Sequence, residues 1–185
     1  EPPAGRRAGA ERAAPKTLDE MSLDEIIAHR TRLLTDYQNA AYAARYRDLV
    51  DQVRKVSFNN GYGEALPRAV AINYAKLLAY KDEYEVARLY TDGRFADNLR
   101  RQFEGDFKIS FNLAPPILQK GVDALGRPKK RVFGPWLLPV LRTMARFRFL
   151  RGTIFDPFGH SADRKLERDL IKGYEQDVVT VFKLL

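Results

Sequence analysis

The chain has 185 residues, of which 45% are hydrophobic and 30% are charged, and this is the balance of a folded globular protein. It contains no cysteine, which excludes disulfides, thiolate nucleophiles, zinc–thiolate sites and iron–sulfur ligation, because each needs the sulfur atom. The net charge of +8 favours an acidic partner: a protein, a phosphorylated cofactor, nucleic acid or an anionic membrane.

No apolar run approaches the ~18 residues that a membrane span needs. The N-terminus shows no basic stretch followed by an apolar one, so no secretory signal is visible. Together with the absence of cysteine, these features predict a cytoplasmic protein.

Residues 1–17 are rich in Pro, Ala, Gly and Arg and have no periodic apolar pattern, so we predict a flexible linker or tail there. Residues 18–185 are expected to form a single helical domain. Ser22 and Glu25 have the spacing of a capping box, which marks the start of the first helix. Apolar positions from Leu23 to Val56 lie on two rotated faces and predict one long, central helix that packs on both sides.

The turn sequence NNGYG at 59–63 ends that helix, and a second helix is predicted from Pro67 to Leu89. Gly93 stops it, and a short helix through Phe95, Leu99 and Phe103 follows. Apolar and polar residues then alternate over 107–113, which predicts a half-buried strand.

Residues 131–133 are predicted to form a short return strand, which gives one small antiparallel hairpin around residues 107–133. A helix from Trp136 to about Leu150 follows, and Ser161 can cap the last helix. The apolar stripe expected in this last helix is Leu166, Leu170, Tyr174, Val178 and Phe182. The sequence therefore predicts a mainly α fold, an α-rich α+β arrangement of five to six helices with one β-hairpin.

Motifs for catalysis, cofactor binding and metal binding are all incomplete. The Gly61-Tyr62-Gly63 segment lacks the third glycine and the following Lys-Ser/Thr pair of a phosphate loop, so a helix stop explains it better. The only imidazoles are those of His29 and His160, in distant segments. We therefore predict no catalytic, cofactor-binding or metal-binding residue in this chain.

A carboxylate cluster offers one alternative. Asp82 and Glu85, three residues apart on the predicted helix, could share a face and serve general acid–base chemistry. However, the spacings from Lys81 to Glu85 and from Glu85 to Arg88 are those of ordinary helix ion pairs. We favour the structural interpretation.

The basic segment from Arg127 to Arg151 is the strongest functional signal in the sequence. It carries no acidic residue, and aromatic residues are interleaved with its charges. The candidate partner-docking residues are Arg127, Lys129, Lys130, Arg131, Trp136, Arg142, Arg146, Arg148 and Arg151.

Three interpretations of this basic segment stay open. The charges can protect an edge strand and cover a solvated helix face. They can instead dock an acidic protein, for which Trp and Arg anchors supply affinity. A membrane-surface helix or a nucleic-acid patch is the third, and it is disfavoured because the aromatics have core-like spacings and no nucleic-acid motif accompanies them.

Several stretches of the sequence are distinctive: YQNAAYAARY (37–46), AYKDEYEVARLYTDG (79–93), QFEGD (102–106), LAPP (113–116), FGPW (133–136) and LRGTIFDPFG (150–159). Taken together, they resemble the carboxy-terminal region of the long, fused indolepyruvate ferredoxin oxidoreductases. The resemblance extends from about residue 18 to the end.

The resemblance implies a parent enzyme that oxidatively decarboxylates aryl 2-oxoacids such as indolepyruvate, using thiamine diphosphate with Mg²⁺, and passes electrons through iron–sulfur clusters to ferredoxin. None of that machinery maps onto this chain, and Glu104-Gly105-Asp106 is not the Gly-Asp-Gly motif of a thiamine site. The chain would be a non-catalytic accessory domain for inter-domain assembly or for docking an acidic partner such as ferredoxin.

Its expected partners are the rest of the parent chain, ferredoxin and a second copy of itself. The alternative is a stand-alone basic interaction module for an anionic protein, a membrane surface or nucleic acid.

Overall fold

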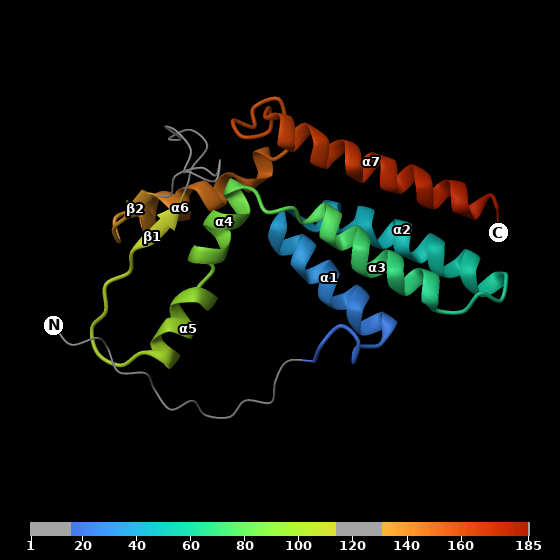
Figure 1. Ribbon diagram of the computed structural model, residues 1–185, viewed down its shortest axis with the longest axis horizontal. Coiled ribbons are helices and arrows are strands. Elements are labelled where there is room, and N and C mark those ends of the chain that lie inside the picture. Colours follow the sequence, from blue (N-terminus) through green and yellow to red (C-terminus); the bar gives the residue numbers. More distant parts are fainter. Residues whose placement is uncertain (1–15, 114–130, 185) are drawn as a thin grey trace, which may run out of the picture. The chain divides into compact units, whose positions relative to one another are not determined.

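The computed structural model describes residues 16–113 and 131–184 (Figure 1). These residues form seven α-helices and one two-stranded antiparallel sheet, which confirms the predicted α-rich fold with a small hairpin. Most of the predicted linker 1–17, and the residues between the two strands, lie outside the described residues. None of the helices in the described ranges is long and apolar enough to cross a membrane.

The sequence suggested one domain over residues 18–185. The described residues group into two compact units. The first, which we call the four-helix unit, comprises residues 16–82 and 148–184. It contains α1 (Leu23–Tyr37), α2 (Ala40–Asn59), α3 (Ala65–Leu78) and α7 (Ala162–Phe182). The second, the hairpin unit, comprises the described part of 83–147. It contains α4 (Glu83–Thr91), α5 (Arg94–Gln102), β1 (Phe111–Leu113), β2 (Arg131–Phe133) and α6 (Leu137–Arg146).

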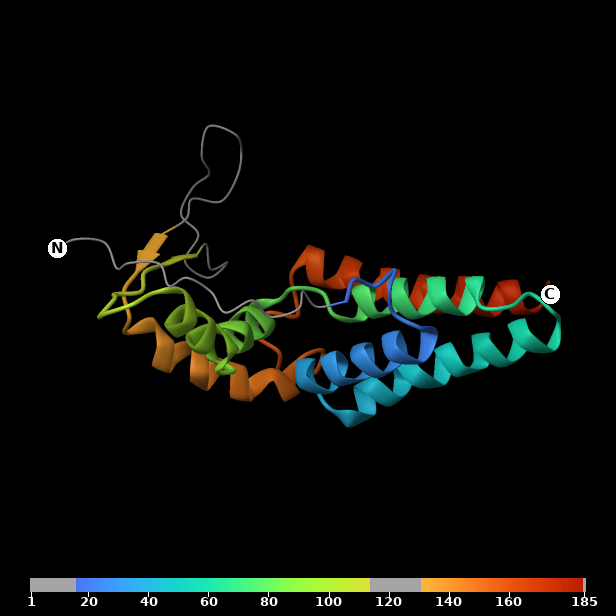
Figure 2. The ribbon, with the colours of Figure 1, turned by 90° about the horizontal axis from the view of Figure 1, so that it is seen from below.

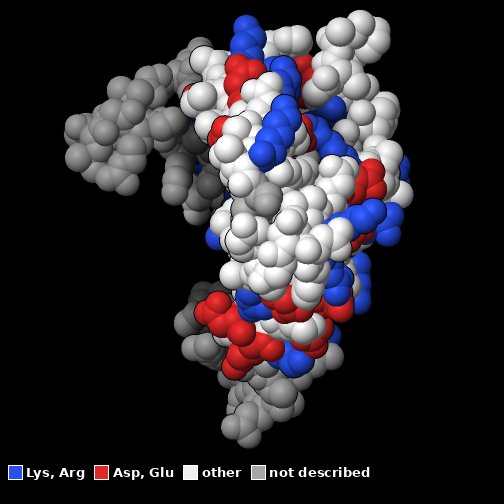
Figure 3. All heavy atoms as spheres, turned by 90° about the vertical axis from the view of Figure 1, so that its right-hand side faces the viewer, with Lys and Arg blue, Asp and Glu red and all other residues white. Residues whose placement is uncertain are grey.

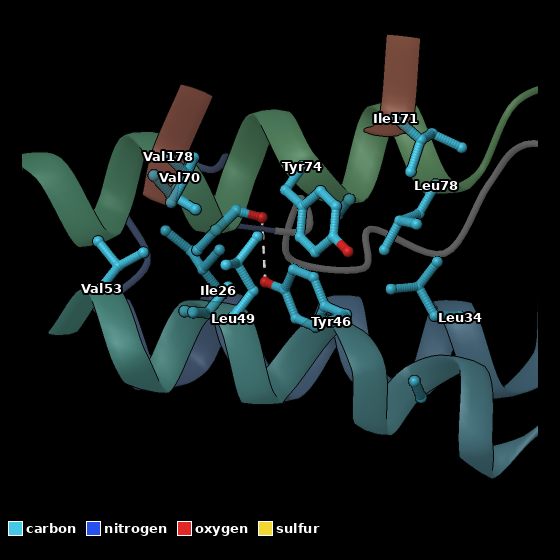
Figure 4. Close-up of a cluster of buried hydrophobic side chains, with 14 of the residues drawn as sticks. Ile26, Leu34, Tyr46, Leu49, Val53, Val70, Tyr74, Leu78, Ile171 and Val178 are labelled. Carbon is cyan, nitrogen blue, oxygen red and sulfur yellow. Dashed lines mark hydrogen bonds between the residues drawn. The ribbon is translucent and has the colours of Figure 1, made fainter. Parts of the chain in front are cut away.

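The core of the four-helix unit is built around buried tyrosines. In Figure 2, α1 runs beside α2, and α3 runs beside α7. The Tyr46 ring is fully buried, and its hydroxyl donates to the carbonyl oxygen of Ala71 at 3.0 Å (Figure 4). The Tyr74 ring stacks on Tyr46 and also on Tyr174 of α7, with centroids 6.0 and 5.8 Å apart. Because each buried hydroxyl needs a hydrogen-bond partner, the tyrosines fix the positions of the helices relative to one another as well as burying apolar area.

The predicted single helix from Leu23 to Val56 is wrong, because the chain breaks between α1 and α2. The capping box of Ser22 and Glu25 is present at the start of α1, as predicted. At the break, the Asn39 side chain accepts a hydrogen bond from the Tyr42 amide at 2.8 Å and caps a new helix. The two apolar faces assigned to one helix therefore belong to two.

The predicted helix from Pro67 to Leu89 is also interrupted. Helix α3 ends at Leu78, and α4 begins at Glu83. Asp82 lies in the connection and is 3% exposed, so it does not share a helix face with Glu85. The two breaks account for the additional helices.

The core of the hairpin unit is smaller. Its buried members are Ala87, Phe111, Leu137, Leu141 and Ala145. The strand predicted over 107–113 pairs only at Phe111–Leu113, with Phe111 opposite Phe133. The Tyr90 ring contacts the edges of Phe95 and Phe111, with both centroid distances at 5.1 Å.

Helices α6 and α7 differ from the predictions in detail. The helix expected from Trp136 to about Leu150 is α6, followed by a 3-10 turn at Phe147–Leu150. Ser161 caps α7, as predicted, by accepting from the Arg164 amide. In the predicted stripe of α7, Leu166 and Leu170 are exposed (59% and 51%), and Ile171 takes the buried position instead.

Candidate docking surface

Three of the predicted docking residues, Trp136, Arg142 and Arg146, are exposed on α6 or at its N-terminus. Leu137, Leu141 and Ala145 recur every four residues and are buried, so they define the inner face of α6. Helix α4 packs against α6 in this unit. The opposite face of α6 is left to solvent.

Large apolar side chains line that opposite face. Trp136, Val140 and Phe147 are spaced by four and seven residues and are 62%, 47% and 46% exposed. On a helix these spacings place side chains in one stripe. We call this set the α6 stripe. A cluster of exposed large apolar residues is typical of an interaction site.

The Trp136 indole is held in place although it is exposed. Its ring meets the edge of the Phe133 ring on β2, with centroids 6.0 Å apart and planes at 69°. A side chain at Gly134 would press on the indole, because a Cβ there would lie 3.3 Å from Cδ1 of Trp136. The hairpin thus restricts the indole, and this lowers the entropy that a partner must remove on binding.

Three arginines of the basic segment belong to the same unit. Arg131 on β2 and Arg142 and Arg146 on α6 are all exposed. Arg127, Lys129 and Lys130, also predicted to dock a partner, lie outside the described residues. The structure therefore places four predicted residues, the three arginines and Trp136, on this unit.

The prediction that Arg151 docks a partner is wrong. Arg151 is 5% exposed, and its guanidinium donates to both carboxylate oxygens of Asp82 at 2.5 and 2.8 Å. It also donates to the carbonyl oxygen of Tyr37 at 2.6 Å and stacks on the Tyr37 ring at 3.6 Å. Burial opposes its charge, but the hydrogen bond to Asp82, together with the electrostatic effects of Asp82, Tyr37 and Tyr80, outweighs burial, and the pKa of Arg151 is raised.

Arg148 also belongs to the four-helix unit. Its side chain is half-buried, and Nε donates to the carbonyl oxygen of Gln38 at 3.4 Å. The spacing of charges along the segment gave no sign that Arg148 and Arg151 would separate from Arg142 and Arg146. Only the burial of each position distinguishes them.

The carboxylate cluster is structural, as favoured above. Glu85 is 8% exposed and accepts two hydrogen bonds from Arg88, at 2.7 and 2.8 Å. Asp82 is occupied by Arg151. In residues 16–113 and 131–184, no group of three or more His, Asp or Glu side chains could hold a metal ion.

Charge is mixed on the face of the molecule that Figure 3 shows. In Figure 3, Lys and Arg side chains are interspersed with Asp and Glu around a broad area of uncharged residues. The positive excess is therefore not gathered on that face. Arg131, Arg142 and Arg146 lie in a sequence segment, residues 124–155, that contains no acidic residue.

Comparison with known proteins gives a family without a function. The model of a family of unknown function (DUF6537) matches residues 23–185. No curated protein and no solved structure matches the chain.

Proposed function

We propose a function from the premise that the chain belongs to the DUF6537 family: it is a non-catalytic accessory domain of a cytoplasmic 2-oxoacid:ferredoxin oxidoreductase of the indolepyruvate type. The stretches at 37–46, 79–93 and 150–159 support this proposal by their resemblance to that enzyme. The parent body would supply thiamine diphosphate, Mg²⁺ and the iron–sulfur clusters. The role of this chain is to dock an acidic partner, ferredoxin, on the outer face of α6.

The α6 stripe and its flanking arginines are the observation that carries this role. Arg142 and Arg146 are exposed on α6, as are Val140 and, at its N-terminal end, Trp136, and no acidic residue of the same segment offsets the arginines. Positive charge steers an acidic protein to the surface and raises the association rate. Trp and Arg are also the residues that most often anchor protein interfaces.

Charge reversal on α6 tests the proposal. The double variant Arg142→Glu/Arg146→Glu is compared with Lys165→Glu/Lys172→Glu, which changes the same number of exposed charges on α7. The measurement is the rate of ferredoxin reduction by the complete enzyme at low and high salt. We expect the α6 variant to lose about tenfold or more at low salt, and the difference to disappear as salt screens the charges.

The α7 variant should remain within about twofold of the wild type, because its lysines lie outside the docking surface. Equal ferredoxin kinetics for the wild type and the α6 variant at low salt would contradict the docking role.

Assembly with the catalytic body is a second candidate role, and it is favoured by a different observation. The four-helix unit exposes several large apolar side chains, most strongly Ile154, Phe155 and Leu184 at 82%, 74% and 80%. Single exposed apolar residues are ordinary, but adjacent ones need an explanation.

A further inference from the structure

The outer face of α6 repeats with the spacing of a helix–helix seam. Its members follow one another by four, three and four residues and are all exposed: Trp136, Val140, Thr143 and Phe147. Trp136 has helical backbone angles (φ −58°, ψ −18°), so the repeat begins at the residue that precedes α6. Intervals of four and three are those of the a and d positions, which meet a partner helix in a coiled coil.

The threonine at position 143 is compatible with an apolar partner. The Thr143 hydroxyl donates to the carbonyl oxygen of Pro139, one turn earlier in the same helix, at 3.0 Å. Because this donor is satisfied within the helix, covering Thr143 with an apolar surface leaves no unpaired hydroxyl hydrogen. The α6 stripe and Thr143 therefore form one continuous row, about 16 Å long at 1.5 Å per residue.

The row is narrow, and its width indicates the kind of surface that it fits. At 100° per residue its four members lie within about 60° of the helix circumference. Leu137, Leu141 and Ala145 are buried on the inner face of α6, so they do not widen the exposed row. A helix that lies in a membrane surface buries a wider apolar arc, whereas a narrow row of a and d positions fits another helix.

One flank of the row is basic. Helix geometry places Arg146 about 90° and Arg142 about 130° around α6 from the centre of the row, both on the same side. Both arginines are exposed, and neither forms an ion pair with another residue of 16–113 or 131–184. Charges that flank a seam select partner helices of opposite charge, so the facing edge of the partner is acidic.

We infer that the element of the acidic partner that docks here is an amphipathic α-helix, which lies along α6 and packs an apolar row against the α6 stripe and Thr143. Carboxylates on one edge of that helix face Arg146 and Arg142. The Trp136 indole, which Phe133 restrains at a centroid distance of 6.0 Å, anchors one end of the seam. This inference rests on the proposed docking function and deepens it, because it names the element and the side-chain pattern that ferredoxin presents.

Photo-crosslinking of the complete enzyme to ferredoxin tests the partner helix directly. Val140 or Phe147, seven residues apart on the row, is replaced by p-benzoylphenylalanine. Because two helices that pack along their length keep a constant offset, we expect the two attachment sites to lie about seven residues apart in one helix of ferredoxin. The same crosslinker at Leu166, an exposed position of α7, is the control and should attach no ferredoxin.

A charge placed in the row separates the seam from the arginines on its flank. Val140→Asp is compared with Val179→Asp, which introduces the same charge at a valine of α7 with similar exposure (47% and 43%). We expect Val140→Asp to bind ferredoxin about 30-fold more weakly or worse, because its carboxylate would be buried unpaired in the seam. Val179→Asp should stay within about twofold of the wild type.

The salt dependence of ferredoxin binding distinguishes the two contributions. Salt screens the exposed arginines, so the loss caused by Arg142→Glu/Arg146→Glu should fade at high salt. The loss caused by Val140→Asp should persist at both salt concentrations, because it comes from a buried charge. Hydrogen exchange of the α6 amides checks that each variant keeps the inner packing of the helix.

The outcomes separate this inference from the function on which it rests. Attachment of the crosslinker to a strand or a loop of ferredoxin, or wild-type affinity of Val140→Asp, overturns the partner helix and leaves the docking function standing. No binding of ferredoxin to the wild-type enzyme at low salt overturns both. Sedimentation of the wild type with phosphatidylserine vesicles that Val140→Asp abolishes would overturn the inference in favour of a membrane surface.

Discussion

Each of the two units buries an arginine–carboxylate pair, but one pair joins segments that are distant in sequence and the other lies within a single helix. In the four-helix unit, Arg151 and Asp82 are 69 residues apart in the chain and join two separate connections. In the hairpin unit, Arg88 and Glu85 are three residues apart and lie on one turn of α4. The local pair strengthens a helix that its spacing already predicts. The distant pair ties together segments that nothing in the local sequence relates.

A third pair extends the comparison toward the surface. Arg45 of α2 and Glu175 of α7 are 2.7 Å apart, with side chains 44% and 27% exposed. The hydroxyl of Tyr74 also donates to Glu175. The side chains of the other two pairs are 3% exposed for Arg151–Asp82 and 10–11% exposed for Arg88–Glu85. If burial determines how much stability is lost when a pair is broken, the loss should be largest for Arg151–Asp82, intermediate for Arg88–Glu85 and smallest for Arg45–Glu175.

The largest effect is expected for Asp82→Ala. It removes the carboxylate from the buried Arg151 guanidinium, and the Tyr37 carbonyl oxygen and ring supply no negative charge in its place. Breaking a buried pair in this way costs about 3–5 kcal/mol. Urea unfolding of the four-helix unit, followed by hydrogen exchange of its core amides, measures the loss. The matched control is Lys81→Ala, an exposed neighbour, which should change the free energy of unfolding by less than about 0.5 kcal/mol. Similar changes in the free energy of unfolding for Asp82→Ala and Lys81→Ala would show that the Arg151–Asp82 pair contributes little to stability.

An intermediate effect is expected for Glu85→Ala. Arg88 would keep Asp92, whose carboxylate lies 3.4 Å away, so its charge is not left alone. We expect a loss of about 1–3 kcal/mol, confined to the hairpin unit and detected as faster hydrogen exchange in α4. Asp97→Ala on α5 is the control, because its pair with Arg100 is more than half exposed. If Glu85→Ala lowered the free energy of unfolding as much as Asp82→Ala does, the ranking by burial would be contradicted.

The smallest effect is expected for Glu175→Gln, and it depends on pH. Burial opposes ionisation of Glu175, but hydrogen bonds from Arg45 and Tyr74 outweigh it, so the pKa of Glu175 is lowered. A lowered pKa stabilises the fold above the unfolded value of about 4.3, and this stability disappears as the pH falls through the folded pKa. The variant should therefore lose less than about 1 kcal/mol at pH 7 and nothing near pH 3.

Unfolding of the wild type and the Glu175→Gln variant across this pH range provides the measurement. Asp169→Asn is the control, since its pair with Lys172 is about 70% exposed on both sides. A difference between wild type and Glu175→Gln that stays constant from pH 3 to pH 7 would contradict the assigned shift.

Periodicity and capping predicted the type of most elements. Ser22 and Ser161 cap helices where the sequence placed them, and residues 131–133 pair with β1 as the return strand. The two missed breaks, at Asn39 and before Glu83, lie inside patterns that are compatible with an uninterrupted helix. At each break Arg151 makes a tertiary contact: it binds the Tyr37 carbonyl oxygen at the first and the Asp82 carboxylate at the second.

The sequence likewise located some of the exposed candidate residues and missed others. Composition located the basic segment, and Trp136, Arg142 and Arg146 are exposed on the hairpin unit. The exposure of Ile154 and Phe155 was missed, because apolar residues in a sequence are expected in a core. One signal was available: the Gly-rich turn with an internal Asp is the composition of a side-chain-capped loop.

The sequence by itself determined which segments are helical, where several of them begin and which stretch carries positive charge, because these properties depend on neighbours within about one turn of the chain. Only the tertiary structure decided that Arg151 is buried while Arg146 is exposed, and that Leu166 and Ile154 face solvent. Burial depends on segments that are distant in sequence, so the same arginine can anchor a fold or meet a partner according to what packs over it.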